Sequence, residues 1–376
     1  MEQTNNNGKW WVIGVIVLIV IVIFASRGGS KETGPIKIGF IGPLTGDAAN
    51  IGQNAQAAVQ IAVKEINDAG GIKGRPLEVI FEDGKCNGKD ASDAANKLIN
   101  IDKISAILGG ACSGETSAFT SLAEQSKTTV LSYCSSVPAL TNAGDYIFRN
   151  YPSDAFQGKF AADYIYNNLG KKSVAVMYVK SDWGNGIKDV FIDNYKKLGG
   201  IVLDEEGYDQ TSRDLRSQLS KIKSDKPELI YFLGYTEASI PALTQAKALG
   251  ITIPFFGGDA WDDGKIWSTV GSAGENAMYT VGATDANEAF KVKMKEKVGS
   301  DEFAVCSPTA YDGMNILAEV MQKVGSNSEA IKNELYKTVY TKGVSSKEIK
   351  FDANGDLVGA NYSVKVIKAG KAELVK

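Results

Sequence analysis

Two serines lie where the chain leaves predicted β-strands. Ser113 follows the apolar run 104–108 and precedes a helix predicted from about Glu115. Unpaired backbone N–H groups and the helix dipole favour an anion at such a start, although a serine there can also be a plain N-cap. Ser136 lies in the loop SYCSSVP, which can equally be a serine-rich turn closed by Pro138.

An aromatic and an acidic residue follow two later strand-like runs. Tyr235 comes after LIYFL and Asp259 after IPFF. A carboxylate in such a place can pair with a cationic group of a ligand, or it can be a solvated loop acid or an N-cap. Trp183, in KSDWGNG, either faces a site or packs under its own helix.

The chain has no histidine, which weighs against an enzyme. Ser-His-Asp and Cys-His nucleophile pairs and the commonest zinc ligand are therefore excluded. Cys112-Ser113-Gly114 is no nucleophile elbow, because no base is available and Gly110 stands three positions before the serine. The glycines of GFIGPLTG lack the dinucleotide-binding spacing. We expect no catalytic residue, no metal and no cofactor.

Length and charge set the class of protein. A chain of 376 residues suits two domains of ordinary size. Its 41 Lys and Arg nearly balance 44 Asp and Glu, so nothing indicates nucleic-acid binding.

Residues 10–26 form an apolar segment at the short end of the roughly 17–25 residues that span a bilayer. Tandem tryptophans at its head argue against a buried core helix. No A-x-A site follows and no cysteine near its end could carry a lipid, which favours an uncleaved anchor over a cleaved signal peptide. Lys9 precedes the segment while Arg27 and Lys31 follow it, so charge does not fix its orientation.

After residue 35, strand-like runs alternate with helical patterns. The run 36–41 leads into a helix whose Ala55, Ala58, Val59 and Ala62 recur on one face, and Gly70 and Gly71 end that helix. Further strands are predicted at 77–81, 104–108, 129–131, 174–178, 201–204, 229–233, 253–256 and 279–281, and helices near 88–100, 115–126, 155–168, 186–198, 212–224, 237–249, 287–297, 308–323 and 328–340.

This alternation predicts an α/β fold with parallel sheets flanked by helices. Ligands of such folds bind beyond the carboxyl ends of the strands. Near the C-terminus, Asn354-Gly355 predicts a tight hairpin turn between EIKFD and DLVGANYSVKVI.

The order of several sequence strings closely resembles the leucine/isoleucine/valine-type periplasmic amino-acid-binding proteins, the substrate-binding subunits of branched-chain amino-acid ABC transporters. The strings are IKIGFIGPLTG, GGACSGETSAF, SYCSSVPALTNAGDYIFR, SDAFQG, GYTE, FFGGDAW and SPTAYDGM. The resemblance implies a two-lobed type I fold with a hinge. It divides the chain into a tail (1–9), the anchor or signal segment (10–26), a linker (27–35), an N-terminal lobe (35–153 plus 282–343) and a C-terminal lobe (154–281 plus 344–376).

The resemblance also assigns ligand-binding residues. It implies that Ser113, Cys134 and Ser136 bind the ligand's carboxylate, that Tyr235 and Asp259 bind its ammonium group, and that Trp183 covers its side chain. Asp259 stands where the branched-chain binder has Glu, and Ile51 stands where that binder has an aromatic residue, so the pocket differs from it. A disulfide between Cys86 and Cys112 is implied, while the pairing of Cys134 and Cys306 stays open.

The function that the resemblance implies is capture of a small amino acid between the lobes and its delivery to an ABC permease. Aliphatic and branched-chain amino acids are the first choice. The expected place is the cell membrane, with an ectodomain outside the cytoplasm, or export after cleavage. A ligand-sensing ectodomain that signals through a membrane partner is the alternative, since the fold alone does not decide between the two.

Overall fold

The computed structural model describes residues 34–282, 286–300, 302–359 and 361–375. The predicted tail, the apolar segment 10–26 and all but the end of the linker lie outside these residues. Among the helices of the described ranges, none has the length and apolar content needed to cross a membrane.

The first sheet contains five parallel strands in the order β2-β1-β3-β4-β5. The strands are β1 (Ile36–Gly42), β2 (Leu77–Asp83), β3 (Ala106–Gly109), β4 (Thr129–Ser132) and β5 (Ile147–Arg149). Most of their side chains are buried, as expected for a sheet with helices on both faces. The parallel arrangement confirms the prediction from the alternating pattern, although β5 was not predicted.

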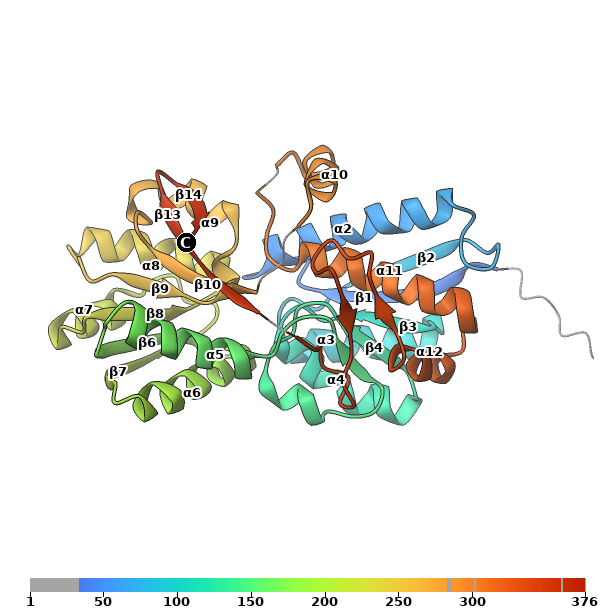
Figure 1. Ribbon diagram of the computed structural model, residues 1–376, viewed down its shortest axis with the longest axis horizontal. Coiled ribbons are helices and arrows are strands. Elements are labelled where there is room, and N and C mark those ends of the chain that lie inside the picture. Colours follow the sequence, from blue (N-terminus) through green and yellow to red (C-terminus); the bar gives the residue numbers. More distant parts are fainter. Residues whose placement is uncertain (1–33, 283–285, 301, 360, 376) are drawn as a thin grey trace, which may run out of the picture. The chain divides into compact units, whose positions relative to one another are not determined.

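Two groups of helices cover this sheet, as Figure 1 shows. One face is covered by α3 (Gly88–Lys97) and α4 (Ser113–Ser126), and the other by α2 (Ala49–Asp68), α11 (Ser307–Val324) and α12 (Ser328–Leu335), while α10 (Glu288–Val298) packs on α2. The predicted stripe of α2 is confirmed, because Ala55, Ala58, Val59 and Ala62 are buried. The start of α2 carries Ile51, which is also buried.

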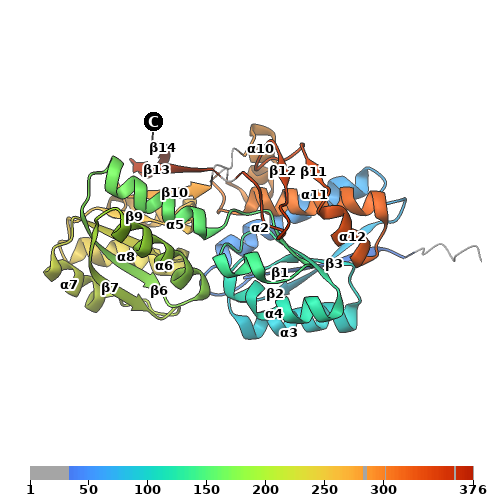
Figure 2. The ribbon, with the colours of Figure 1, turned by 60° about the horizontal axis from the view of Figure 1, so that its bottom comes forward.

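The second sheet has seven strands in the order β14-β13-β10-β9-β8-β6-β7. Five of them run parallel: β6 (Ser173–Val179), β7 (Ile201–Tyr208), β8 (Leu229–Leu233), β9 (Phe255–Gly257) and β10 (Met278–Gly282). Helices α5 (Asp154–Asp163) and α6 (Asp182–Lys197) pack together, as do α7 (Arg216–Asp225), α8 (Thr236–Ala248) and α9 (Gly264–Val270) (Figure 2).

The end of the chain contributes strands to two different sheets. β13 (Tyr362–Lys368) pairs antiparallel with β10 and with β14 (Lys371–Leu374), while β12 (Ile349–Lys350) pairs with β11 (Val339–Tyr340). Between them, Asn354-Gly355 does form a turn, with Gly355 at φ +78°, but only a single bridge joins Phe351 to Leu357. The predicted turn is confirmed, while the segments before and after it pair in two different sheets.

The chain crosses between the sheets three times, after β5, after β10 and before β13. Asp356 stays with the first sheet, because the Arg149 guanidinium donates to both its oxygens at 2.6 and 2.7 Å. The boundary expected at residue 344 stays a prediction, and these contacts support a later one. We propose that the N-terminal lobe extends to Leu357.

Candidate functional site

One cavity is lined by all six residues that were predicted to bind a ligand. It lies at the carboxyl ends of the strands of both sheets, where α/β folds place their sites. Water-sized molecules can place their centres in ≈ 30 Å³ of it. Its lining comprises Ile51, Ala111, Cys112, Ser113, Cys134, Ser136, Trp183, Tyr235, Asp259, Ala260 and Val305.

The first sheet supplies hydroxyl and N–H groups to this cavity. α4 begins at Ser113, and Cys112 occupies the N-cap position, so Ser113 is not the N-cap. The Ser113 Oγ instead accepts the backbone N–H groups of Ser136 and Val137 at 3.2 and 3.1 Å. Because this oxygen accepts twice, its own proton remains available to an anion, next to the orphan N–H groups of the first turn of α4.

The second sheet supplies a carboxylate. Asp259 opens the short 3-10 turn Asp259–Trp261 directly after β9, and its side chain is buried. The Tyr151 hydroxyl donates to Asp259 Oδ2 at 2.7 Å. Burial raises the pKa of Asp259, since the cavity withdraws the carboxylate from water. Such a carboxylate gains most when a cation arrives beside it.

A second buried carboxylate, Asp154, lies close behind the site. The Ser136 hydroxyl donates to its Oδ2 at 2.8 Å. With the amide nitrogen of Gln157 facing Asp154, that nitrogen donates to Oδ1 at 2.9 Å and the amide oxygen accepts the Asp259 N–H at 2.8 Å. Burial and the nearby Asp259 charge raise the pKa of Asp154 well above its usual value. Asp154 thus holds Ser136 in place behind the lining of the cavity, and Asp259 is the carboxylate that lines it.

Asp154 was not predicted to be part of the site. It belongs to the string SDAFQG, where a serine followed by an acid reads as an ordinary helix start, and Ser153 does cap α5. No local pattern separates an exposed first-turn acid from this one, which is fully buried. Its contact with Ser136 joins positions 18 residues apart in the chain.

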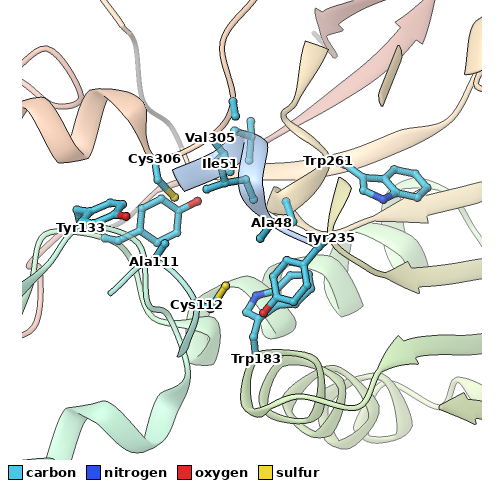
Figure 3. Close-up of a cluster of buried hydrophobic side chains, with 14 of the residues drawn as sticks. Ala48, Ile51, Ala111, Cys112, Tyr133, Trp183, Tyr235, Trp261, Val305 and Cys306 are labelled. Carbon is cyan, nitrogen blue, oxygen red and sulfur yellow. The ribbon is translucent and has the colours of Figure 1, made fainter. Parts of the chain in front are cut away.

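Apolar groups form the remaining walls. Trp183, in the first turn of α6, stacks on Tyr235 with ring centroids 5.0 Å apart (Figure 3). Trp183 thus lines the cavity, instead of packing only beneath its own helix. Ile51 and Val305 approach from α2 and from the segment before α11.

Glu115 and Tyr133 lie behind the cavity and do not line it. Glu115 accepts backbone N–H groups of Cys86, Ala111 and Cys112, each at 3.0 Å, and so fixes the loop that carries the first-sheet donors. Burial nevertheless raises the pKa of Glu115 to about 7. Its role is to hold the loop in place.

Two disulfides tie the edges of the site. Cys86 is bonded to Cys112, as the family resemblance implied, and Cys134 is bonded to Cys306. The sequence left the pairing of Cys134 and Cys306 open, and in the structure they pair with each other. Both bonds fix loops at the carboxyl ends of first-sheet strands.

Polar contacts join the two lobes at the cavity's rim. Arg213 is paired with Asp47, which lies just before α2. The Asn50 amide donates to Asp263 Oδ1 at 2.7 Å, and the Gln210 amide donates to the Cys86 carbonyl at 3.3 Å. Together with the small volume of the cavity, these contacts show that the two lobes are closed around the site.

In the described ranges no cluster of three or more His, Cys, Asp or Glu side chains could hold a metal ion.

Residues 35–371 match the family model described as periplasmic binding protein, so the chain belongs to this family of extracytoplasmic solute-binding proteins. The leucine-, isoleucine-, valine-, threonine- and alanine-binding protein of Pseudomonas aeruginosa is 28% identical over 91% of each chain. The Leu/Ile/Val-binding protein of Escherichia coli K12 is 26% identical over 88% of this chain and 90% of its own.

Solved structures agree in fold. A leucine-binding protein from Thermotoga maritima has a TM-score of 0.83 at 28% identity, covering 91% of this chain and 98% of its own. A substrate-binding protein of a branched-chain amino-acid transporter from Streptococcus pneumoniae, in complex with isoleucine, has a TM-score of 0.82 at 29% identity, covering 91% and 99%. These likenesses confirm the predicted family and the two-lobed type I fold.

Proposed function

We propose that the protein captures a small neutral amino acid between its two lobes and delivers it to an ABC permease. The main support for this proposal is that Ser113 and Asp259, which follow strands of different sheets, line the same small cavity. Hydroxyl and N–H donors on one wall suit a carboxylate, and the buried acid on the other suits an ammonium group. Only a ligand with both charges at short separation satisfies both walls.

The apolar lining supports an aliphatic side chain. Ile51, Trp183, Tyr235 and Val305 offer no charge to a side chain in the cavity. The names of the relatives, which refer to leucine, isoleucine, valine, threonine and alanine, point the same way.

Ligand capture would stabilise the closed arrangement of the lobes. In the proposed cycle, the rim contacts between Arg213 and Asp47 and between Asn50 and Asp263 form as the lobes close. The closed form then differs in surface from the open form, so a permease can distinguish loaded from empty protein.

We also propose that residues 10–26 anchor the protein in the membrane, with the binding lobes outside the cytoplasm. This part of the proposal rests on the apolar length of the segment and on two disulfides, which persist in oxidising compartments. Fractionation of cells that express the full chain would test it: the protein should sediment with membranes, and its lobes should be accessible to protease from outside. Quantitative release as a shortened soluble chain would contradict the anchor.

Calorimetric titration of the purified full-length protein with each of the twenty amino acids tests the binding function. We expect saturable binding of at least one small neutral amino acid, and none of the matching amine or carboxylic acid that lacks one of the two charges. Equal binding of the free carboxylic acid would refute the two-charge site, and absence of binding to all twenty would refute the proposed ligand class.

A further inference from the structure

A second, larger cavity adjoins the first, and Val305 lines both of them. Water-sized molecules can place their centres in ≈ 550 Å³ of this cavity, against ≈ 30 Å³ of the ligand cavity. Its lining includes Asp262, Trp267, Tyr279, Lys365, Val305 and Cys306. The segment Val305–Cys306, which we call the partition, therefore separates a nearly filled space from a roomy one.

The partition is held from both lobes. The Cys134–Cys306 disulfide ties it to the loop after β4, and the Val305 N–H donates to the Asp262 carbonyl of the second lobe at 2.8 Å. Thr309, three residues further along, donates to the Tyr133 carbonyl at 2.7 Å. Val305 and Cys306 are both buried (Figure 3). Fixed at so many points, the valine side chain has little freedom to move aside for a larger ligand.

The ligand cavity offers far less room than the second cavity, since the centres of water-sized molecules have ≈ 30 Å³ in the first and ≈ 550 Å³ in the second. Val305 is buried and forms part of the lining of both. With so little free space beside Val305, each further methylene group of a ligand side chain must press on this residue or on another fixed residue of the lining.

The charges of the second cavity near the partition are already paired. Lys365 donates to Asp262 Oδ1 at 2.6 Å, and the Tyr279 hydroxyl donates to the same oxygen at 2.8 Å. The indole of Trp267 stacks on the Tyr279 ring with centroids 5.6 Å apart, giving the cavity an aromatic wall. The lining also includes the charged residues Lys291 and Glu302. A neutral side chain that passed Val305 would therefore reach an aromatic wall and the paired charges of Asp262 and Lys365.

We propose that the disulfide-held partition sets the upper size limit of the ligand, so that the protein prefers amino acids with the smallest side chains, and that the second cavity is a latent extension of the site for longer neutral side chains. The inference rests on the proposed function and deepens it. One methylene group more or less in a fitted apolar pocket changes preference by about 10- to 200-fold, so the partition is sufficient to decide between alanine and leucine.

Val305→Ala in the full-length protein tests this role directly. Calorimetry with alanine, leucine and methionine should give tightest binding of alanine to the wild type. The variant should shift the leucine-to-alanine affinity ratio at least 10-fold towards leucine, because the second cavity becomes accessible. Val292→Ala, the same change at an exposed position of α10, is the matched control and should leave the ratio unchanged.

A Cys134→Ser, Cys306→Ser double variant should shift the ratio in the same direction, since the partition then loses its tie to the first lobe. If that variant does not fold, Val305→Ala decides alone. An unchanged ratio in Val305→Ala, with amino-acid binding retained, would overturn the size limit and leave the proposed function standing. Wild-type protein that binds no amino acid would overturn both.

Discussion

Replacing Asp259 by asparagine separates a ligand-binding role from a structural one. The asparagine has the same shape, and its side-chain oxygen can still accept the Tyr151 hydroxyl that donates to Asp259 at 2.7 Å. What disappears is the negative charge that faces the cavity. In the proposed complex this charge receives the ligand's ammonium group.

The expected loss of affinity follows from the burial of the pair. A hydrogen bond to a charged group contributes roughly 1.5–3 kcal/mol, and each 1.4 kcal/mol is a factor of ten. Asp259→Asn should therefore weaken amino-acid binding by about 10- to 150-fold.

Stability should move in the opposite direction. Burial raises the pKa of Asp259, so its stabilising contribution is complete below the unfolded pKa and is lost as the pH rises through the folded one. At neutral pH the raised pKa of Asp259 therefore costs stability in the empty protein, and Asp259→Asn should leave the melting temperature unchanged or raise it.

Calorimetry and thermal unfolding of the same preparations measure both effects. Asp193→Asn, an identical change at an exposed ion pair of α6, is the control and should alter neither quantity by much. Wild-type affinity in Asp259→Asn would remove this residue from the ammonium site. Lower affinity together with a lower melting temperature would instead indicate a structural role.

Three further changes probe the support of the site. Ser113→Ala should weaken binding about tenfold or more and, by leaving two N–H groups unpaired, cost about 1–3 kcal/mol of stability; normal calorimetric affinity with lowered stability would make this serine purely structural. Burial raises the pKa of Glu115 to about 7, so the stabilising contribution of the protonated Glu115 is complete below about pH 4.5 and is lost as the pH rises towards 7. Glu115→Gln should therefore reduce the fall of the unfolding free energy in urea between these pH values by up to about 3 kcal/mol. An unchanged pH dependence would contradict the raised pKa. Arg213→Ala removes the partner of Asp47 across the two lobes and should reduce the affinity for the amino acid about fivefold. Arg216→Ala, at an exposed ion pair within one lobe, is the control, and an equal loss of affinity in this control would show that the Arg213 effect does not come from closing the lobes.

Much of the fold could be predicted because its signals are local. The apolar stripe of α2 follows from helical spacing, and most of the parallel strands are short apolar runs that precede a helix. The place of β13 in the second sheet could not be predicted, because its antiparallel pairing with β10 depends on a partner about 80 residues earlier in the chain, and β14 in turn pairs with β13. The direction of a strand relative to its neighbours depends on the tertiary fold, and the residue pattern of a single strand does not predict it.

The site shows the same division between local and distant information. Ser113, Tyr235 and Asp259 could be found because strand ends in α/β folds converge on one edge, and the family resemblance then assigned their roles. Asp154 could not be found, since its first-turn position is typical of exposed helix starts and only the packing around it removes it from water.

The partition is the hardest part of the site to predict, because no residue in it has a chemical group that suggests ligand binding. Val305 is an ordinary apolar residue before a helix, and Cys306 becomes informative only when its disulfide partner, 172 residues earlier, is known. The charged and hydroxyl residues that bind the carboxylate and ammonium groups common to all amino acids can therefore be predicted from the sequence. The walls that choose among amino acids are made of apolar residues brought together by the fold, and for this reason relatives that share the clamp can differ in the ligand they prefer.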